Sequence, residues 1–161
     1  MKTLALLLAV MAFSPVRLAA ETKPSDPSDP LSFEKIAAVV PANVGIKRGT
    51  KPDAVGIALA NVALKQVIGK QAALDVVVEK VTPTNSTRAP ILVQSRQTQV
   101  TFGNTKVPCS VFTYVLAKEV TILAHVKKAT AIKVSGKVIK AVIGKNAELI
   151  IDLDDAEVKL K

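Results

Sequence analysis

Residues 132–158, IKVSGKVIKAVIGKNAELIIDLDDAEV, decide the fold of this chain. Apolar and polar side chains alternate on both sides of a short glycine turn, which predicts two long β-strands. Gly136 interrupts the first alternation, and the second slips in phase at Asp154 and Asp155. Both strands should therefore bend in mid-course, as the strands of a small closed barrel do at its corners.

Residues 1–20 have the pattern of a secretory signal peptide. Lys2 precedes an apolar run over residues 4–13, and small residues stand before a cleavage point after Ala20. That run is too short for a stable transmembrane helix, although a retained membrane anchor is the alternative interpretation. We therefore expect an exported chain, periplasmic or secreted, that keeps 141 of its 161 residues. Loss of Lys2 and Arg17 lowers the formal net charge from +9 to +7.

Prolines, serines and aspartates fill residues 21–30, ETKPSDPSDP, a composition typical of a linker. The linker and a loosely docked segment that follows it are together expected to occupy residues 21–52. The remainder, residues 53–161, has the size of one folded domain. Its single cysteine, Cys109, excludes an intramolecular disulfide, so packing must stabilise the domain.

The start of the domain predicts a helix over residues 54–68, with Asp53 as the N-cap and Gly69 just after the last turn. Apolar residues occur nearly all round this helix, so it should be largely buried. Three strands should follow, because strand-type apolar patterns bounded by turn residues occupy residues 73–81, 91–102 and 107–116.

The next segment, AKEVTILAHVKKAT at residues 117–130, has an apolar spacing that suits a helix, whereas its β-branched residues leave a strand as the alternative. We choose the helix. The chain is then mainly β, a five-stranded barrel with one preceding helix and one helix between strands 3 and 4. This is the topology of an OB fold.

The chain also resembles a known family in Asn61 and in the motifs VIGK, VPCSVF, VSGKV and LIIDL, at residues 67–70, 107–112, 134–138 and 149–153. The family is the tRNA-anticodon-binding-like OB-fold family of small exported bacterial domains, and the resemblance covers residues 54–158. Members often carry Gly-Asp before the fourth strand, where this chain has Ala129 and Thr130. The resemblance implies an OB barrel and bacterial export, and it brings neither catalytic residues nor tRNA binding.

Residues that could carry catalysis or hold a metal are few. His125 and Cys109 are the chain's one histidine and one cysteine, and they lie far apart in the sequence. Asp152, Asp154 and Asp155 lack the spacing and the glycine of a calcium-binding loop. The pattern S-x-x-K at residues 32–35 adjoins the linker and lacks the partner motifs of its enzyme class. We expect no enzyme activity, no metal and no cofactor.

Most of the excess positive charge lies on lysines of the expected strands and turns, namely Lys118, Lys127, Lys128, Lys133, Lys137, Lys140 and Lys145. Lysines placed in this way keep sheet edges soluble and unpaired. A basic chain also suits contacts with phosphates, so a nucleic acid is the competing explanation of the charge.

An OB fold binds ligands across its second and third strands, where aromatic rings stack and basic groups hold charge. On that basis the candidate ligand-binding residues are Arg96, Phe102, Lys106, Phe112, Tyr114 and Lys118. The alternative is that the phenylalanines fill the core. We expect a non-enzymatic binding or interaction module of the bacterial envelope, with a protein or an anionic oligosaccharide or polymer as partner. The runner-up is a single-stranded nucleic-acid binder that uses a lysine-rich face with Phe112 and Tyr114.

Overall fold

The computed structural model describes residues 29–44, 46 and 53–161. The predicted signal peptide and most of the predicted linker lie outside the described residues. The described helices and strands are α1 (Phe33–Ala38), α2 (Ala54–Leu64), β1 (Gln71–Pro83), β2 (Ile91–Ser95), β3 (Thr98–Phe102), β4 (Thr105–Val115), α3 (Val120–Leu123), β5 (Ala131–Ile143) and β6 (Leu149–Leu160). Two single 3₁₀ turns, η1 (Lys65–Val67) and η2 (Ala117–Glu119), follow α2 and precede α3.

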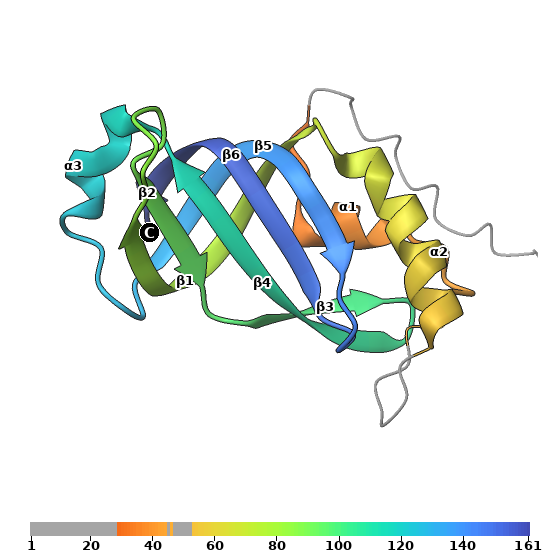
Figure 1. The fold of residues 1–161 in the computed structure, drawn as a ribbon. Coiled ribbons are helices and arrows are strands. Elements are labelled where there is room, and N and C mark those ends of the chain that lie inside the picture. Colours follow the sequence, from red (N-terminus) through yellow and green to blue (C-terminus); the bar gives the residue numbers. More distant parts are fainter. Residues whose placement is uncertain (1–28, 45, 47–52) are drawn as a thin grey trace, which may run out of the picture.

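The chain is mainly β, with one six-stranded sheet in the order β2-β1-β5-β6-β4-β3 (Figure 1). β2 pairs with β4 as well as with β1, so the ladder of pairings through β1, β2, β4, β6 and β5 returns to its starting strand. β4 and β6 run parallel, whereas the other pairs are antiparallel. β3 extends this ring as an edge strand beside β4.

The sheet has six strands where five were expected, because the predicted second strand is broken into two. β2 ends at Ser95 and β3 starts at Thr98. At the break the N–H of Arg96 donates to the carbonyl oxygen of Val77 in β1, at 2.7 Å. The chain thus leaves β1 and turns so that β3 continues along β4 alone.

Both predicted bends occur where the alternation predicted them. The residues expected to face inward are buried together in the core: Ile132, Val134, Val138, Leu149, Ile151 and Leu153. The β5–β6 register shifts between Ser135 and Lys137, around Gly136. Opposite this glycine, Asp155 takes a positive φ of 52°, so β6 carries the extra residue of a β-bulge.

The helices differ from the prediction at α1, at α3 and at the end of α2, which stops at Leu64 and passes into η1 instead of running to Ile68. α1 was not predicted, yet Ser32 caps it by accepting from the N–H of Lys35 at 3.3 Å, and Ile36 is buried in the core. The helix predicted between the third and fourth strands is reduced to the single turn α3. Its residues Val120 and Ile122 are β-branched, and no side chain caps its N-terminus, so little favours a longer helix.

α2 begins as predicted, because the Asp53 carboxylate accepts from the N–H groups of Val55 and Gly56, both at 3.1 Å. The prediction that this helix is largely buried is wrong. One side packs on β5, but Val55, Leu59 and Val62 are exposed, because no described segment covers the second apolar side. No helix in the described part of the chain has the length and apolar character required to cross a membrane.

A single amide side chain fixes α2 to the end of β5. Asn61 Nδ2 donates to the carbonyl oxygen of Ile143 at 3.0 Å, and Asn61 Oδ1 accepts from the N–H of Ile143 at 2.6 Å. Asn61→Ala should lower the free energy of unfolding by about 2 kcal/mol, because both backbone groups lose their partner in a half-buried place. Urea unfolding measures the loss. Gln66→Ala, at an exposed position of η1, should change stability by less than about 0.5 kcal/mol, and equal losses would contradict this role.

Candidate ligand-binding groove

The outward side of β4, which lies between β2 and β6, is partly open to solvent, because Phe112 and Tyr114 are half-buried while Ser110 is buried. Inward-pointing residues of β4 are buried: Val107, Cys109, Val111, Thr113 and Val115. Phe112 points the other way and is half-buried, with Gln94 of β2 and Asp152 of β6 as its cross-strand partners. A row of three outward side chains thus crosses three strands.

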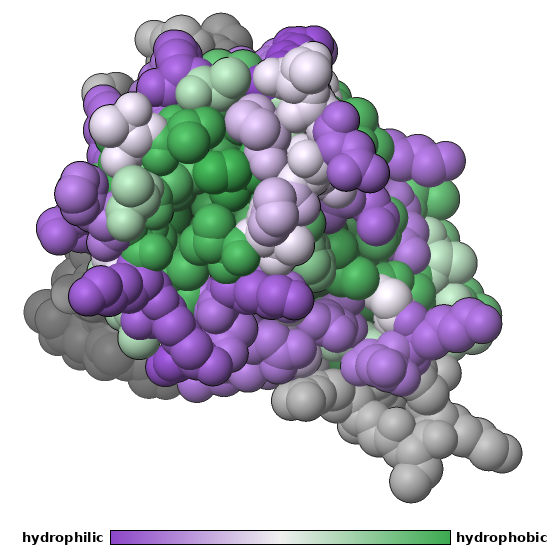
Figure 2. All heavy atoms as spheres, turned by 60° about the vertical axis from the view of Figure 1, so that its left-hand side comes forward, coloured by the Kyte–Doolittle hydropathy of each residue, from purple (hydrophilic) through white to green (hydrophobic). Residues whose placement is uncertain are grey.

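A groove of about 480 Å³ opens beside Phe112 on this outer face, lined by Glu79, Gln94, Ser95, Arg96, Gln97, Ser110, Phe112, Glu148 and Ile150. Seen from the side of α3 and β2, the surface also has a hollow of apolar side chains that hydrophilic side chains surround (Figure 2). The surface at α3 and β2 therefore combines apolar contact area with polar groups at its borders.

Glu148 is the centre of a hydrogen-bonded cluster in the groove. Its Oε1 atom accepts from Gln97 Nε2 at 2.9 Å and from Ser110 Oγ at 2.7 Å. Ser95 Oγ accepts from the N–H of Val111 at 2.9 Å, so this hydroxyl is fixed as well. Glu148 forms no ion pair with a described cation. Neutral donors hold the carboxylate in place and leave its second oxygen for a ligand.

The cations near the groove are already paired. Lys128 Nζ lies 2.5 Å and Arg96 Nε 3.5 Å from the carboxylate of Glu79. The hydrogen bond from Lys128, helped by Arg96, holds the pKa of the half-buried Glu79 carboxyl below its usual value. At Asp152, burial raises the pKa, and Lys140 Nζ at 3.7 Å opposes this shift only in part.

The structure brings two of the six predicted ligand-binding residues into the groove, Arg96 and Phe112. Tyr114 lies two residues further along the same outward side of β4 and is half-buried. Phe102 is only 5% exposed and belongs to the core, so it does not join them. Lys106 is exposed at the start of β4, and Lys118 in η2 pairs with Glu157 at 2.6 Å, so neither lines the groove.

The sequence reasoning missed six polar residues of the groove, which are Glu79, Gln94, Ser95, Gln97, Ser110 and Glu148. A partial signal exists for Ser110, because it alternates with Phe112 and so shares its side of the strand. Glu148 gives no such signal. It lies in the turn before β6, and only the parallel pairing of β4 with β6 brings it to Ser110.

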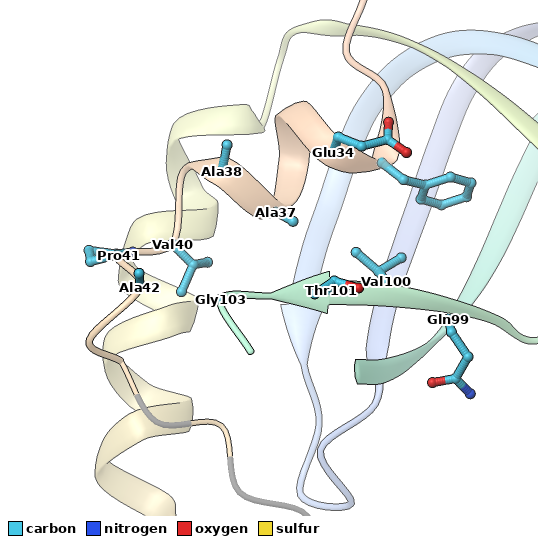
Figure 3. Close-up of a pocket in the computed structure, with 11 residues that line it drawn as sticks. Glu34, Ala37, Ala38, Val40, Pro41, Ala42, Gln99, Val100, Thr101 and Gly103 are labelled. Atoms are coloured by element: carbon cyan, nitrogen blue, oxygen red, sulfur yellow. The ribbon is translucent and has the colours of Figure 1, made fainter. Parts of the chain in front are cut away.

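A second hollow, of about 430 Å³, lies between α1 with the loop after it and β3 (Figure 3). Its walls are mostly small or apolar, with Ala37, Val40 and Val100 among them. Glu34 is the one titratable residue among the described residues that line it, and a hydrogen bond with Ser32 lowers the pKa of this exposed carboxyl. The hollow therefore lacks the pair of titratable groups that acid–base chemistry requires.

Among residues 29–44, 46 and 53–161, no three His, Cys, Asp or Glu side chains gather as a metal site would require. His125 is exposed beside α3, and Cys109 is buried in the core.

No family model matches this sequence, and no curated protein matches it. Among solved structures, it is similar to the mitochondrial single-stranded DNA binding protein Rim1 from S. cerevisiae, with a TM-score of 0.36 and 8% identity over 56% of this chain and 92% of that one. It is also similar to the protein PriB from Ralstonia solanacearum, with a TM-score of 0.35 and 16% identity over 54% of this chain and 94% of that one. For a small single-stranded DNA binding protein from Mycoplasma pneumoniae the TM-score is 0.34, with 15% identity over 54% of this chain and 90% of that one. Similarity at this level does not define a ligand for this chain.

Proposed function

We propose that this chain is a non-enzymatic OB-fold barrel, exported to the bacterial envelope, that binds an extended, uncharged, hydroxyl-rich polymer such as an oligosaccharide. The closed ladder of strand pairings with one parallel pair supports the barrel. Faces of this kind bind oligonucleotides and oligosaccharides in OB folds. Export rests on the pattern of residues 1–20.

The observation that carries this proposal is the setting of Phe112. Its half-buried ring lies in a groove with the amides of Gln94 and Gln97, the Ser110 hydroxyl and the Glu148 carboxylate. A ring offers a flat apolar surface to the face of a sugar, while amide, hydroxyl and carboxylate groups exchange hydrogen bonds with its hydroxyls. A few fixed polar groups around an apolar contact are the usual make-up of a small-ligand site.

The charges of the groove favour an uncharged ligand over an anionic one. Among the described residues that line it, Arg96 is the one basic residue, against the carboxylates of Glu79 and Glu148. Lysines such as Lys133 and Lys137 are on β5, which does not contribute to the groove. A polyanion needs cations at the site of contact. We therefore propose a neutral ligand for this groove in place of the anionic oligosaccharide or polymer expected from the sequence.

Single-stranded nucleic acid is the second candidate ligand, because two rings share one side of β4. Phe112 and Tyr114 are both half-buried and two residues apart, which separates them by about 7 Å along the strand. Successive bases stack on rings placed in this way. The high pI of the chain, about 9.8, also favours a polyanion at longer range.

The test compares fluorescein-labelled chitohexaose with labelled oligo-dT by fluorescence anisotropy, each at low and at high NaCl. The proposal expects the sugar to bind with little change as salt rises. Phe112→Ala should weaken that binding by about tenfold or more, since a stacking ring contributes on the order of 1–3 kcal/mol. Lys106→Gln, an exposed change outside the groove, is the control and should leave the affinity unchanged.

The proposal of a sugar ligand would be overturned in favour of a nucleic acid if oligo-dT binds, if its affinity falls steeply with salt, and if this binding needs Phe112. If neither probe binds, both proposed ligand classes are wrong, and if a probe binds but Phe112→Ala leaves its affinity unchanged, the groove is not the binding site.

A further inference from the structure

Three large apolar side chains of α2 face solvent in one row. Val55 is 69% exposed, Leu59 53% and Val62 63%. Their spacing of four and three residues places them on the same side of the helix. The eleven residues of α2 include no charged side chain, so an uninterrupted apolar stripe faces outward.

The opposite side of α2 holds this stripe in place. Ala60, Ala63 and Leu64 are buried, and the two hydrogen bonds between Asn61 and Ile143 fix the helix to β5. The stripe cannot turn inward without breaking these contacts. A fixed, exposed apolar surface of this kind marks an interaction site.

Further apolar surface lies where the chain leaves α2 and meets β5. The N–H of Gly69 donates to the carbonyl oxygen of Val138 at 2.7 Å. The residues next to these two in sequence, Ile68 and Ile139, are 45% and 44% exposed. The apolar surface at this end of the molecule therefore extends beyond the helix itself.

The charged groups that adjoin the stripe in sequence are basic. Lys65 and Lys70 follow α2, both are exposed, and neither forms an ion pair with a described carboxylate. Asp53 is the one acidic neighbour, and its carboxylate is engaged by the first N–H groups of the helix. An apolar stripe with a positive edge complements a surface that is apolar inside and negative outside.

We propose that α2 docks on the surface of an anionic lipid bilayer, with Val55, Leu59 and Val62 in the lipid and Lys65 and Lys70 at the headgroups. Eleven residues make a helix of about 16 Å, which lies in the interface and does not span. A second copy of the chain fits less well, because a twofold contact through the stripe brings the same unpaired lysines together. This inference is independent of the ligand in the groove.

Vesicle flotation tests the docking with two lipid mixtures, phosphatidylcholine alone and phosphatidylcholine with phosphatidylglycerol. The full chain should float with the anionic vesicles. Leu59→Gln with Val62→Gln should reduce the bound fraction about tenfold or more, because the apolar contact is lost while helix propensity is kept. Leu160→Gln is the matched control, since Leu160 is 50% exposed at the far end of β6 and should not matter.

A charge-matched pair of variants locates the basic contact. Each lysine near an anionic surface strengthens membrane binding about fivefold. Lys65→Gln with Lys70→Gln should therefore weaken partitioning of the chain into anionic vesicles about 25-fold. Lys133→Gln with Lys159→Gln removes the same charge from the neighbouring strands β5 and β6 and should change little. The proposal is overturned if both pairs lose binding equally or if the two lipid mixtures bind the chain alike. It is also overturned if the wild type is a dimer that Leu59→Gln with Val62→Gln dissociates.

Discussion

Valine in place of Gly136 should lower the free energy of unfolding by at least about 3 kcal/mol, and alanine by about 2 kcal/mol. A Cβ atom at this position would lie 2.8 Å from the carbonyl oxygen of Asp154 and 3.0 Å from Cβ of Ala156. Both neighbours belong to the β6 bulge, and one contact is with backbone, so no flexible side chain can move aside. The larger residue must therefore separate β5 from β6 where the two strands bend.

Urea unfolding, followed by circular dichroism, measures this loss for Gly136→Ala and Gly136→Val. Gly144→Ala is the matched control, because its Cβ would meet only the carbonyl oxygen of Glu148 at an ordinary 3.7 Å. We expect a change below about 1 kcal/mol there. Similar stabilities for the two alanine variants would mean that the bulge yields easily and that Gly136 is not needed for the bend.

The paired strands at the C-terminal end could be predicted from sequence because the fold constrains their alternation strictly. A strand with one side in the core must show period two, and each break in that period at Gly136 or Asp155 corresponds to a bulge. The exposure of α2 could not be predicted in the same way. Its apolar residues identify a helix, but composition does not say how many of its sides find a partner.

The candidate site was predictable only in part, for a related reason. Phe112 and Phe102 are the same kind of residue on neighbouring strands, yet one lies in the groove and the other in the core. The break between β2 and β3 sets which way Phe102 points, and no motif in the sequence marked it. The contact of Ser110 with Glu148 spans 38 residues and depends on tertiary pairing alone.

The thiol of Cys109 should react with thiol reagents about a thousandfold more slowly in the native protein than in the unfolded chain. Burial, with a smaller effect from the charge of Glu148, raises the pKa of this thiol from 9.0 to about 12. A pKa higher by about three units lowers the thiolate fraction at neutral pH about a thousandfold relative to the unfolded chain. Only the thiolate attacks the reagent. Because folding favours the neutral thiol, its contribution to stability is complete below pH 9.0 and is lost as the pH rises toward about 12.

Absorbance with a chromogenic disulfide reagent follows the reaction at pH 8 in buffer and in concentrated urea. The same experiment separates direct attack from reaction through unfolding. If Cys109 reacts only when the sheet opens, the rate in buffer should rise in Gly136→Ala by the same factor as the unfolded fraction, and Gly144→Ala should match the wild type. A native rate within about tenfold of the rate in urea would contradict the buried, neutral thiol. It would also require an opening between β4 and β6, beside the pairing of Cys109 with Leu149.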